Sequence, residues 1–260
     1  MLLPGDYLAI AASLLFGLIL ALLVLSKSRV LIAIGYTLAA FTWAVYVLDA
    51  RMDCLWVWLL PHPASTILHL VVVWPALVAV LLGLIRHIKR PGDRRALYVL
   101  SGILILYGAY VLGRQLFDPD IAPESYWEGE VLLQTSASTC IAAASATYLR
   151  TLGVTLDERT TSRRGLISGD GGTLTQAWRI LRLSLPQGTA LHIARLGRAG
   201  LSDGKWRVVS LSIAPFTGHA VVARIERSGA VELRDPLEGV RSLSWDEFAK
   251  SYQGTAVWAE

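Results

Sequence analysis

The stretch Gln134-Thr-Ser-Ala-Ser-Thr-Cys140-Ile-Ala-Ala-Ala-Ser-Ala-Thr-Tyr-Leu-Arg-Thr-Leu-Gly153 decides the fold of the C-terminal half of this 260-residue chain. From Cys140 onward its apolar residues recur at spacings of three and four, which is the period of an amphipathic α-helix. Ser138 or Thr139 can serve as the N-cap. Gly153 is a natural stop, because glycine readily adopts the left-handed conformation that ends many helices. The pattern therefore predicts a helix that begins at Cys140 and ends before Gly153.

Cys140 is one of two cysteines, the other being Cys54. Two cysteines cannot form a disulfide framework, and no CxxC pair indicates zinc. A lone cysteine in a soluble domain is usually a small buried hydrophobe, and that interpretation stays open. In the first turn of a helix, however, unpaired backbone N–H groups and the helix dipole favour the reactive thiolate. The position therefore makes Cys140 a candidate nucleophile.

The residues that follow predict two more helical pieces and then strands. Helices are expected over 156–164 and 173–183, and strands over 190–194, 206–213, 219–225 and 231–234. Within 243–252 a short helix is expected to start at Ser244, with Glu247 at capping-box spacing, and 255–258 is a last strand. Helices followed by antiparallel strands indicate an α+β domain.

His219 and Asp235 are the candidate partners of the thiol. His219 opens a predicted strand directly after Gly218, and a hairpin would return Asp235 to the start of that strand. A thiol needs a base or a favourable field to react at neutral pH, and an imidazole in turn needs an orienting group. Each residue also has an ordinary interpretation: a histidine at a strand end bonded to backbone, and a turn aspartate before Pro236.

A resemblance ties these residues together. Its elements, in chain order, are Gln134, Cys140, a helix ending in Leu-Gly, a Gly-Gly-Thr173 turn, Gly218-His219-Ala-Val-Val, Asp235-Pro236 with Gly239, and Trp245-Asp-Glu-Phe248 before Gly254. Over about residues 128–258 the chain resembles the peptidase C39 family, papain-like domains that cut leader peptides of bacteriocins and related secreted peptides, often after a double glycine.

The resemblance implies a papain-like fold and a role for each of four residues. Cys140 would be the nucleophile, His219 the general base and later the acid, and Asp235 the residue that orients the imidazole. Gln134 would donate to the oxyanion hole together with the backbone N–H of Cys140. The resemblance implies no cofactor. The substrate would be a peptide or protein.

Two residues depart from the family pattern. Ile141 stands where a glycine usually follows the nucleophile, and Thr139 stands where an aspartate commonly precedes it. Ile141 is expected to crowd the substrate cleft or change its shape, which bears on the double-glycine preference. The family's best-known members also belong to export ATPases, and this sequence contains no ATPase domain.

The N-terminal half has the composition of a membrane domain. The chain is 54% hydrophobic and only 17% charged, and the apolar excess lies before residue 115. Four segments are long and apolar enough, or nearly so, to cross a bilayer: 7–26, 30–48, 65–85 and 97–113. The first could instead be a signal peptide, but its apolar run is too long and no basic residue precedes it. We expect a transmembrane helical domain over 1–116, a linker over 117–127 and the peptidase domain over 128–260.

Basic residues predict the orientation of these helices. They gather in two loops, after the first and third segments: Lys27, Arg29, Arg86, Lys89, Arg90, Arg94 and Arg95. By the positive-inside rule these loops are cytoplasmic, so four helices would place the C-terminal domain outside a bacterial-type inner or plasma membrane. From Ile121 onward 15 basic residues face 14 acidic ones, which argues against nucleic acid as a partner.

The sequence thus predicts a membrane-anchored cysteine peptidase whose partners are a polypeptide substrate and the lipid bilayer. Three alternatives stay open. The domain could be a catalytically inactive C39-like module that binds a peptide, the chain could be an assembly subunit that joins other membrane proteins, or it could be a thiol hydrolase acting on cell-wall peptides. Retention of Cys140, His219, Asp235 and Gln134 favours an active enzyme, since binding modules of this kind typically lack the cysteine.

Overall fold

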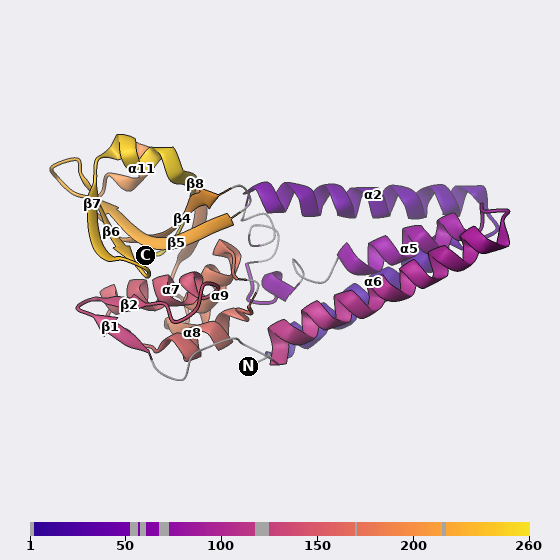
Figure 1. Cartoon of the computed structure of the whole chain (residues 1–260), viewed down its shortest axis with the longest axis horizontal. Coiled ribbons are helices and arrows are strands. Elements are labelled where there is room, and N and C mark those ends of the chain that lie inside the picture. The colour runs from indigo at the N-terminus through magenta and orange to yellow at the C-terminus, as the bar shows by residue number, and fades with distance from the viewer. Residues whose placement is uncertain are drawn as a thin grey trace. The chain divides into compact units, whose positions relative to one another are not determined.

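The computed structural model describes residues 3–52, 57, 61–67, 73–117, 125–169, 171–214 and 217–260. Contacts within the chain divide it into two units, Leu2–Arg114 and Gln115–Glu260. The first unit is helical and the second contains both helices and strands (Figure 1).

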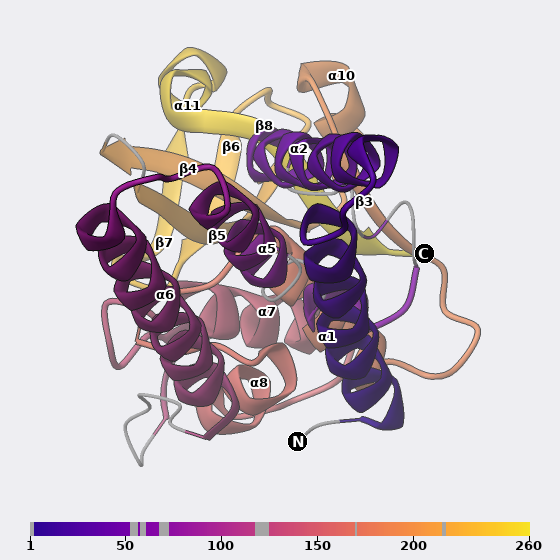
Figure 2. The same cartoon turned by 90° about the vertical axis from the view of Figure 1, so that its right-hand side faces the viewer.

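The helical unit contains α1 (Pro4–Val24), α2 (Arg29–Met52), α5 (Val73–Ile85) and α6 (Pro91–Phe117). Figure 2 shows the same helices after a rotation of 90° about the vertical axis. Helices α1, α2 and α5 pack against one another around Leu20, Val24, Ala39, Ala76 and Ala79. Small residues permit this packing, because a Cβ added to Gly17 would lie only 2.2 Å from the Cβ of Pro75.

Among the described residues, two helices are long and apolar enough to cross a membrane, Pro4–Val24 and Arg29–Leu48. They match the first two predicted segments. Predicted segment 65–85 includes residues 68–72, which lie outside the described residues, and its described helix α5 has 13 residues. Predicted segment 97–113 lies within α6, but the side chains of residues 111 and 112 are not among those described. The four-span arrangement therefore stays a prediction.

The two basic loops lie at the same end of the helical unit. The guanidinium of Arg86, just after α5, donates hydrogen bonds to the backbone carbonyls of Val24 and Ser26, at the end of α1. These bonds join the α1–α2 turn to the α5–α6 turn (Figure 1). Such an arrangement is a requirement of the predicted orientation, which places both loops on one side of a membrane.

The second unit begins with β1 (Tyr126–Glu128), β2 (Val131–Leu133), α7 (Cys140–Thr151), α8 (Glu158–Gly165) and α9 (Leu174–Ser184). It continues with β3 (Leu191–Arg195), α10 (Arg198–Leu201), β4 (Arg207–Ala214), β5 (Thr217–Ile225), β6 (Val231–Asp235), β7 (Gly239–Leu243), α11 (Trp245–Ser251) and β8 (Tyr252–Ala259). Strands β1 and β2 form a hairpin, and the other six form one antiparallel sheet in the order β3-β8-β4-β5-β6-β7. The unit has the predicted α+β order.

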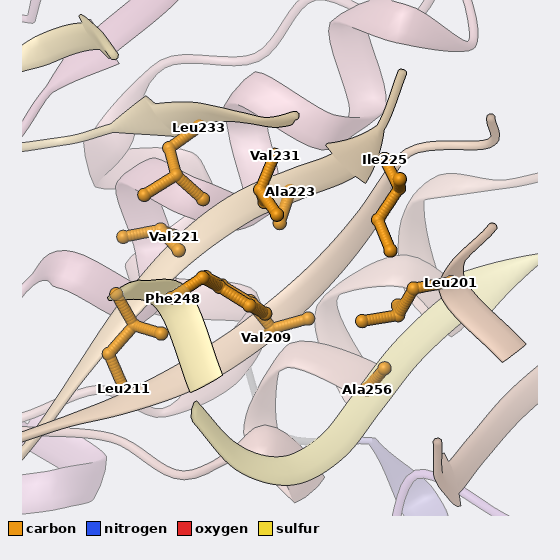
Figure 3. Packing of buried hydrophobic residues seen from close by; sticks show 10 residues of the cluster. All are labelled: Leu201, Val209, Leu211, Val221, Ala223, Ile225, Val231, Leu233, Phe248 and Ala256. Carbon is orange, nitrogen blue, oxygen red and sulfur yellow. The ribbon is translucent and has the colours of Figure 1, made fainter. Parts of the chain in front are cut away.

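Apolar side chains cover both faces of this sheet. On one face a buried cluster lies against α10 and α11 (Figure 3), consisting of Leu201, Val209, Leu211, Val221, Ala223, Ile225, Val231, Leu233, Phe248 and Ala256. The strands alternate in side-chain direction, so the residues between these positions face the other way. That second face is packed by α7, which contacts β5, and by α9, which contacts β3 and β8. Helix α7 is thereby held next to the strand that carries His219.

Most predicted elements of this unit lie within two residues of their observed bounds, but four were not predicted. These are β1, β2, α10 and β7. Strand β1 begins at Tyr126, inside the predicted linker 117–127, so that prediction is wrong at its C-terminal end. A β1–β2 hairpin forms there because apolar residues follow a turn at Gly129, which has a φ of 57°.

Candidate active site

Cys140 is the first residue of α7, as the sequence predicts. Its side chain is buried at 7% exposure. The N-cap residue is Thr139, whose side chain accepts no hydrogen bond from the helix, and among the described residues no side chain accepts one from the N–H groups of the first turn. Free N–H groups and the helix dipole both favour negative charge at this position. Cys140 therefore lies at the positive end of the α7 dipole.

The Thr139 hydroxyl forms hydrogen bonds with the preceding loop and does not cap the helix. It donates to the Ser136 carbonyl at 3.0 Å and accepts from the Ser136 N–H at 3.3 Å. The same carbonyl accepts a hydrogen bond from the side-chain amide of Gln134 at 2.8 Å. These bonds hold the loop between Gln134 and Cys140 in one conformation.

His219 lies near the start of β5, and Asp235 is the last residue of β6, the neighbouring antiparallel strand. The two residues therefore lie at the same end of the two paired strands. Their side chains are joined by a bond of 2.7 Å between His219 Nε2 and Asp235 Oδ1. The Cys140 thiol is the other group that acts electrostatically on the His219 ring. Since Nε2 faces the carboxylate, Nδ1 is the ring nitrogen left for the thiol.

Asp235 is held from three directions. Its Oδ1 accepts a second hydrogen bond, from the backbone N–H of Leu237 at 2.8 Å. Its Oδ2 lies 3.8 Å from a guanidinium nitrogen of Arg241, which also pairs with Glu238 at 2.5 Å. The carboxylate is almost fully buried. It therefore has a fixed direction toward His219.

The electrostatics of the pair follow from these contacts. Burial alone would lower the pKa of His219, but hydrogen bonds to Asp235 and Cys140, together with the charges of both groups, raise it to about 9. Burial likewise acts to raise the pKa of Asp235, but the bonds from His219 and the Leu237 N–H and the charges of His219 and Arg241 lower it below its usual value. At neutral pH the site thus favours an imidazolium beside a carboxylate.

Gln134 is the fourth residue that the sequence singled out. Its backbone N–H donates to the carbonyl of Pro236 at 2.9 Å, which ties it to the residue after Asp235. One N–H of its side-chain amide donates to Ser136, and its Oε1 is buried with no hydrogen-bond partner among the described residues. The structure therefore brings Cys140, His219 and Asp235 together and places Gln134 beside them through its backbone. The described hydrogen bonds of its side chain do not reach Cys140.

Ile141 does not project into open space. Its side chain is 3% exposed, and a Cβ added to Gly172 would lie 3.2 Å from the Cβ of Ile141. The side chain is packed next to Gly172, so it does not crowd a cleft, whereas the expected change in the shape of the cleft stays a prediction. The bulk of Ile141 is accommodated by the absence of a side chain at that glycine.

Arg241 is a residue of the site that the sequence analysis missed. It lies on β7, which was not predicted, and that strand pairs with β6 so that Asp235 is opposite Gly239. The turn residues Asp235-Pro236 and Gly239, with a φ of 79°, were the available signal for a hairpin at this point. No group of three or more His, Cys, Asp or Glu that could hold a metal ion occurs in the described part of the chain.

Comparisons with known proteins add a similarity to a solved structure. No protein-family model matches the chain, and no curated protein matches it. Among solved structures, the chain is similar to the peptidase domain of Streptococcus ComA, a bifunctional ABC transporter involved in a quorum-sensing pathway. The two are 15% identical, the match covers 49% of this chain and 94% of the ComA domain, and the TM-score is 0.44.

Proposed function

We propose that this chain is a membrane-anchored thiol peptidase in which Cys140, His219 and Asp235 form the catalytic triad. The observation that supports the proposal is the position of the His219 imidazole, which is hydrogen-bonded to the buried carboxylate of Asp235 and interacts electrostatically with the thiol of Cys140 at a helix N-terminus. A buried cysteine with a purely structural role needs neither an adjacent imidazole nor a position at a helix N-terminus. The arrangement has the order nucleophile, base and orienting group that acyl transfer uses.

The reaction begins with a thiolate at Cys140 and an imidazolium at His219. The sulfur attacks the carbonyl carbon of the scissile peptide bond, and a C–S bond forms while the carbonyl π electrons move to oxygen. When this intermediate collapses, the C–N bond breaks and the imidazolium gives its proton to the leaving nitrogen. The products of this half are a free amine and a thioester on Cys140.

Water completes the cycle. The neutral imidazole of His219 takes a proton from water as the oxygen attacks the thioester carbon. The C–S bond then breaks, which releases a carboxylic acid and restores the thiolate and imidazolium. Asp235 holds the ring so that Nδ1 faces the sulfur through both halves of the reaction.

The oxyanion of each intermediate needs hydrogen-bond donors. Two are proposed: the backbone N–H of Cys140 and the side-chain amide of Gln134. The Gln134 nitrogen has two N–H groups, and the bond to Ser136 uses one of them. The other is available to the developing charge.

The substrate class proposed is a peptide or protein met at the outer face of a bacterial-type membrane, with secreted leader peptides as the first candidates. The two candidate spans and the shared position of the basic loops support an anchored domain. Reporter fusions after Lys89 and after Glu260 test this topology. A cytoplasmic reporter signal at Lys89 with an extracytoplasmic one at Glu260 is expected, and the reverse pattern would overturn the outward placement.

The experiment that tests the catalytic proposal is the rate of iodoacetamide alkylation of Cys140 as a function of pH, in the full chain with Cys54→Ala as background. Rapid labelling is expected well below the ordinary thiol range of about pH 8.5. His219→Ala should abolish this reactivity at neutral pH. Slow labelling along an ordinary thiol curve would contradict the proposal and would favour an inactive peptide-binding module.

A further inference from the structure

Glu158 is a buried carboxyl group that the proposed mechanism does not use. It is fully buried, at 0% exposure, in the first turn of α8. Its Oε1 accepts a hydrogen bond of 3.0 Å from the backbone N–H of Thr135, the residue after Gln134. Among the described residues no group donates to its Oε2. A buried polar atom without a partner costs stability, so the presence of this carboxyl group calls for an explanation.

The bond to Thr135 completes a set of restraints on Gln134. The N–H of Gln134 is held by the Pro236 carbonyl, and the next N–H along the chain is held by Glu158. These two N–H groups belong to the two peptide planes on either side of the Gln134 Cα. Because a peptide unit is planar, fixing both planes restricts φ and ψ of that residue and hence the direction of its Cα–Cβ bond, from which the amide reaches the Ser136 carbonyl.

We propose that Glu158 is a positioning residue that aims the Gln134 amide at the oxyanion. The inference rests on the proposed function, since it concerns the donor of that same site. Two hydrogen bonds restrain the Gln134 backbone. The acceptor of one is the main-chain carbonyl of Pro236, and the acceptor of the other is the side chain of Glu158. Glu158 is therefore where a substitution can release the donor without touching Cys140, His219 or Asp235.

The test compares two reactions of Cys140 in the full chain with Cys54→Ala. Alkylation by iodoacetamide displaces iodide and forms no oxyanion, whereas acylation by p-nitrophenyl acetate passes through one. In Glu158→Leu the acylation rate should fall about 100-fold, the loss expected when an oxyanion donor is misplaced by about 1 Å. The alkylation rate should stay within about twofold, since the thiolate and imidazole are unaffected. Gln134→Ala should show the same selective loss.

Two control variants separate positioning from general damage to the fold. Glu158→Gln keeps an acceptor oxygen for Thr135 and should restore acylation. Asp157→Ala removes the neighbouring N-cap bond to Thr160 but no bond to the Gln134 loop, so it should leave the ratio of the two rates unchanged. Equal loss of both reactions in Glu158→Leu, or no loss of acylation in Gln134→Ala, would overturn the inference.

A measurement on the unsubstituted protein covers the case in which Glu158→Leu does not fold. Hydrogen exchange at the Thr135 amide should be slow, although Thr135 lies outside the described helices and strands. Fast exchange there would overturn the inference. An unsubstituted protein that is inert in both Cys140 reactions would instead contradict the proposed function itself.

Discussion

Replacing Asp235 by asparagine tests the link between the carboxylate and the charge of the imidazole. Asparagine has the shape of aspartate, and its single oxygen can still accept from both His219 Nε2 and the Leu237 N–H, as Oδ1 of Asp235 does. The substitution therefore removes the negative charge and keeps the geometry. The effect on the pKa of His219 is then mainly electrostatic.

The size of the effect follows from the strength of the bond. A hydrogen bond to a charged group contributes about 1.5–3 kcal/mol and a neutral one about 0.5–1.5 kcal/mol, a difference of about 1–1.5 kcal/mol. One pKa unit corresponds to about 1.36 kcal/mol. The pKa of His219, which is raised to about 9, should therefore fall by about one unit in Asp235→Asn.

Iodoacetate is a probe of this pKa that needs no substrate. As an anion it is attracted by the imidazolium of His219, so its reaction with Cys140 slows when that ring loses its proton. The rate should decline through pH 9 in the unsubstituted site and about one pH unit lower in Asp235→Asn. Neutral iodoacetamide serves as the matched control and should show no such decline. A decline at the same pH in both proteins, or one near the ordinary histidine value of about 6.5 without any substitution, would refute the reasoning.

Three further predictions concern stability and packing. Because the pKa of His219 is raised to about 9, its stabilising contribution is complete below about pH 6.5 and is lost as pH rises through 9, so urea denaturation should show a larger drop over that interval than in His219→Gln. In Tyr148→Phe the Ala259 N–H loses its 2.8 Å bond to the buried hydroxyl, and the free energy of unfolding in urea should fall by about 1–3 kcal/mol. Gly172→Ala would press against the Cδ1 of Ile167 and the Cβ of Ile141, so we expect a loss of about 1–3 kcal/mol in the same assay and slower alkylation of Cys140, whereas unchanged alkylation would contradict the packing argument.

The elements with strong local signals were predictable. The period of the residues after Cys140 and the glycine at 153 gave α7 close to its observed bounds. The capping box at Ser244 and Glu247 is confirmed, with bonds in both directions between the two residues. In each case residues within one or two turns determine the structure, so no distant contact is needed to read it.

The missed elements are short and carry weak local signals. Strand β7 is an edge strand whose residues carry little apolar alternation, and it forms because the turn after Asp235 returns the chain alongside β6. The number of transmembrane helices in the N-terminal half is also hard to predict. Hydropathy alone does not decide whether a short apolar helix such as α5, with 13 residues, crosses a membrane.

The site was predictable in its residue types and order, but not in its side-chain directions. The order of Cys140, His219 and Asp235 indicated three groups that the structure brings together. The direction of Ile141 could not be inferred, because it depends on the space left by Gly172, which is far along the chain. Sequence spacing predicts which residues meet; packing decides which way they point.

The order of strands in the sheet has a consequence for the timing of synthesis. Strand β8, the last element described, lies between β3 and β4, and β4 is the partner of the strand that bears His219. A ribosome releases α7 long before it has made β8. The thiol is therefore present on the nascent chain before the sheet that positions its base can close. The nucleophile can therefore gain its base only after β5 and β6 have been synthesised and paired.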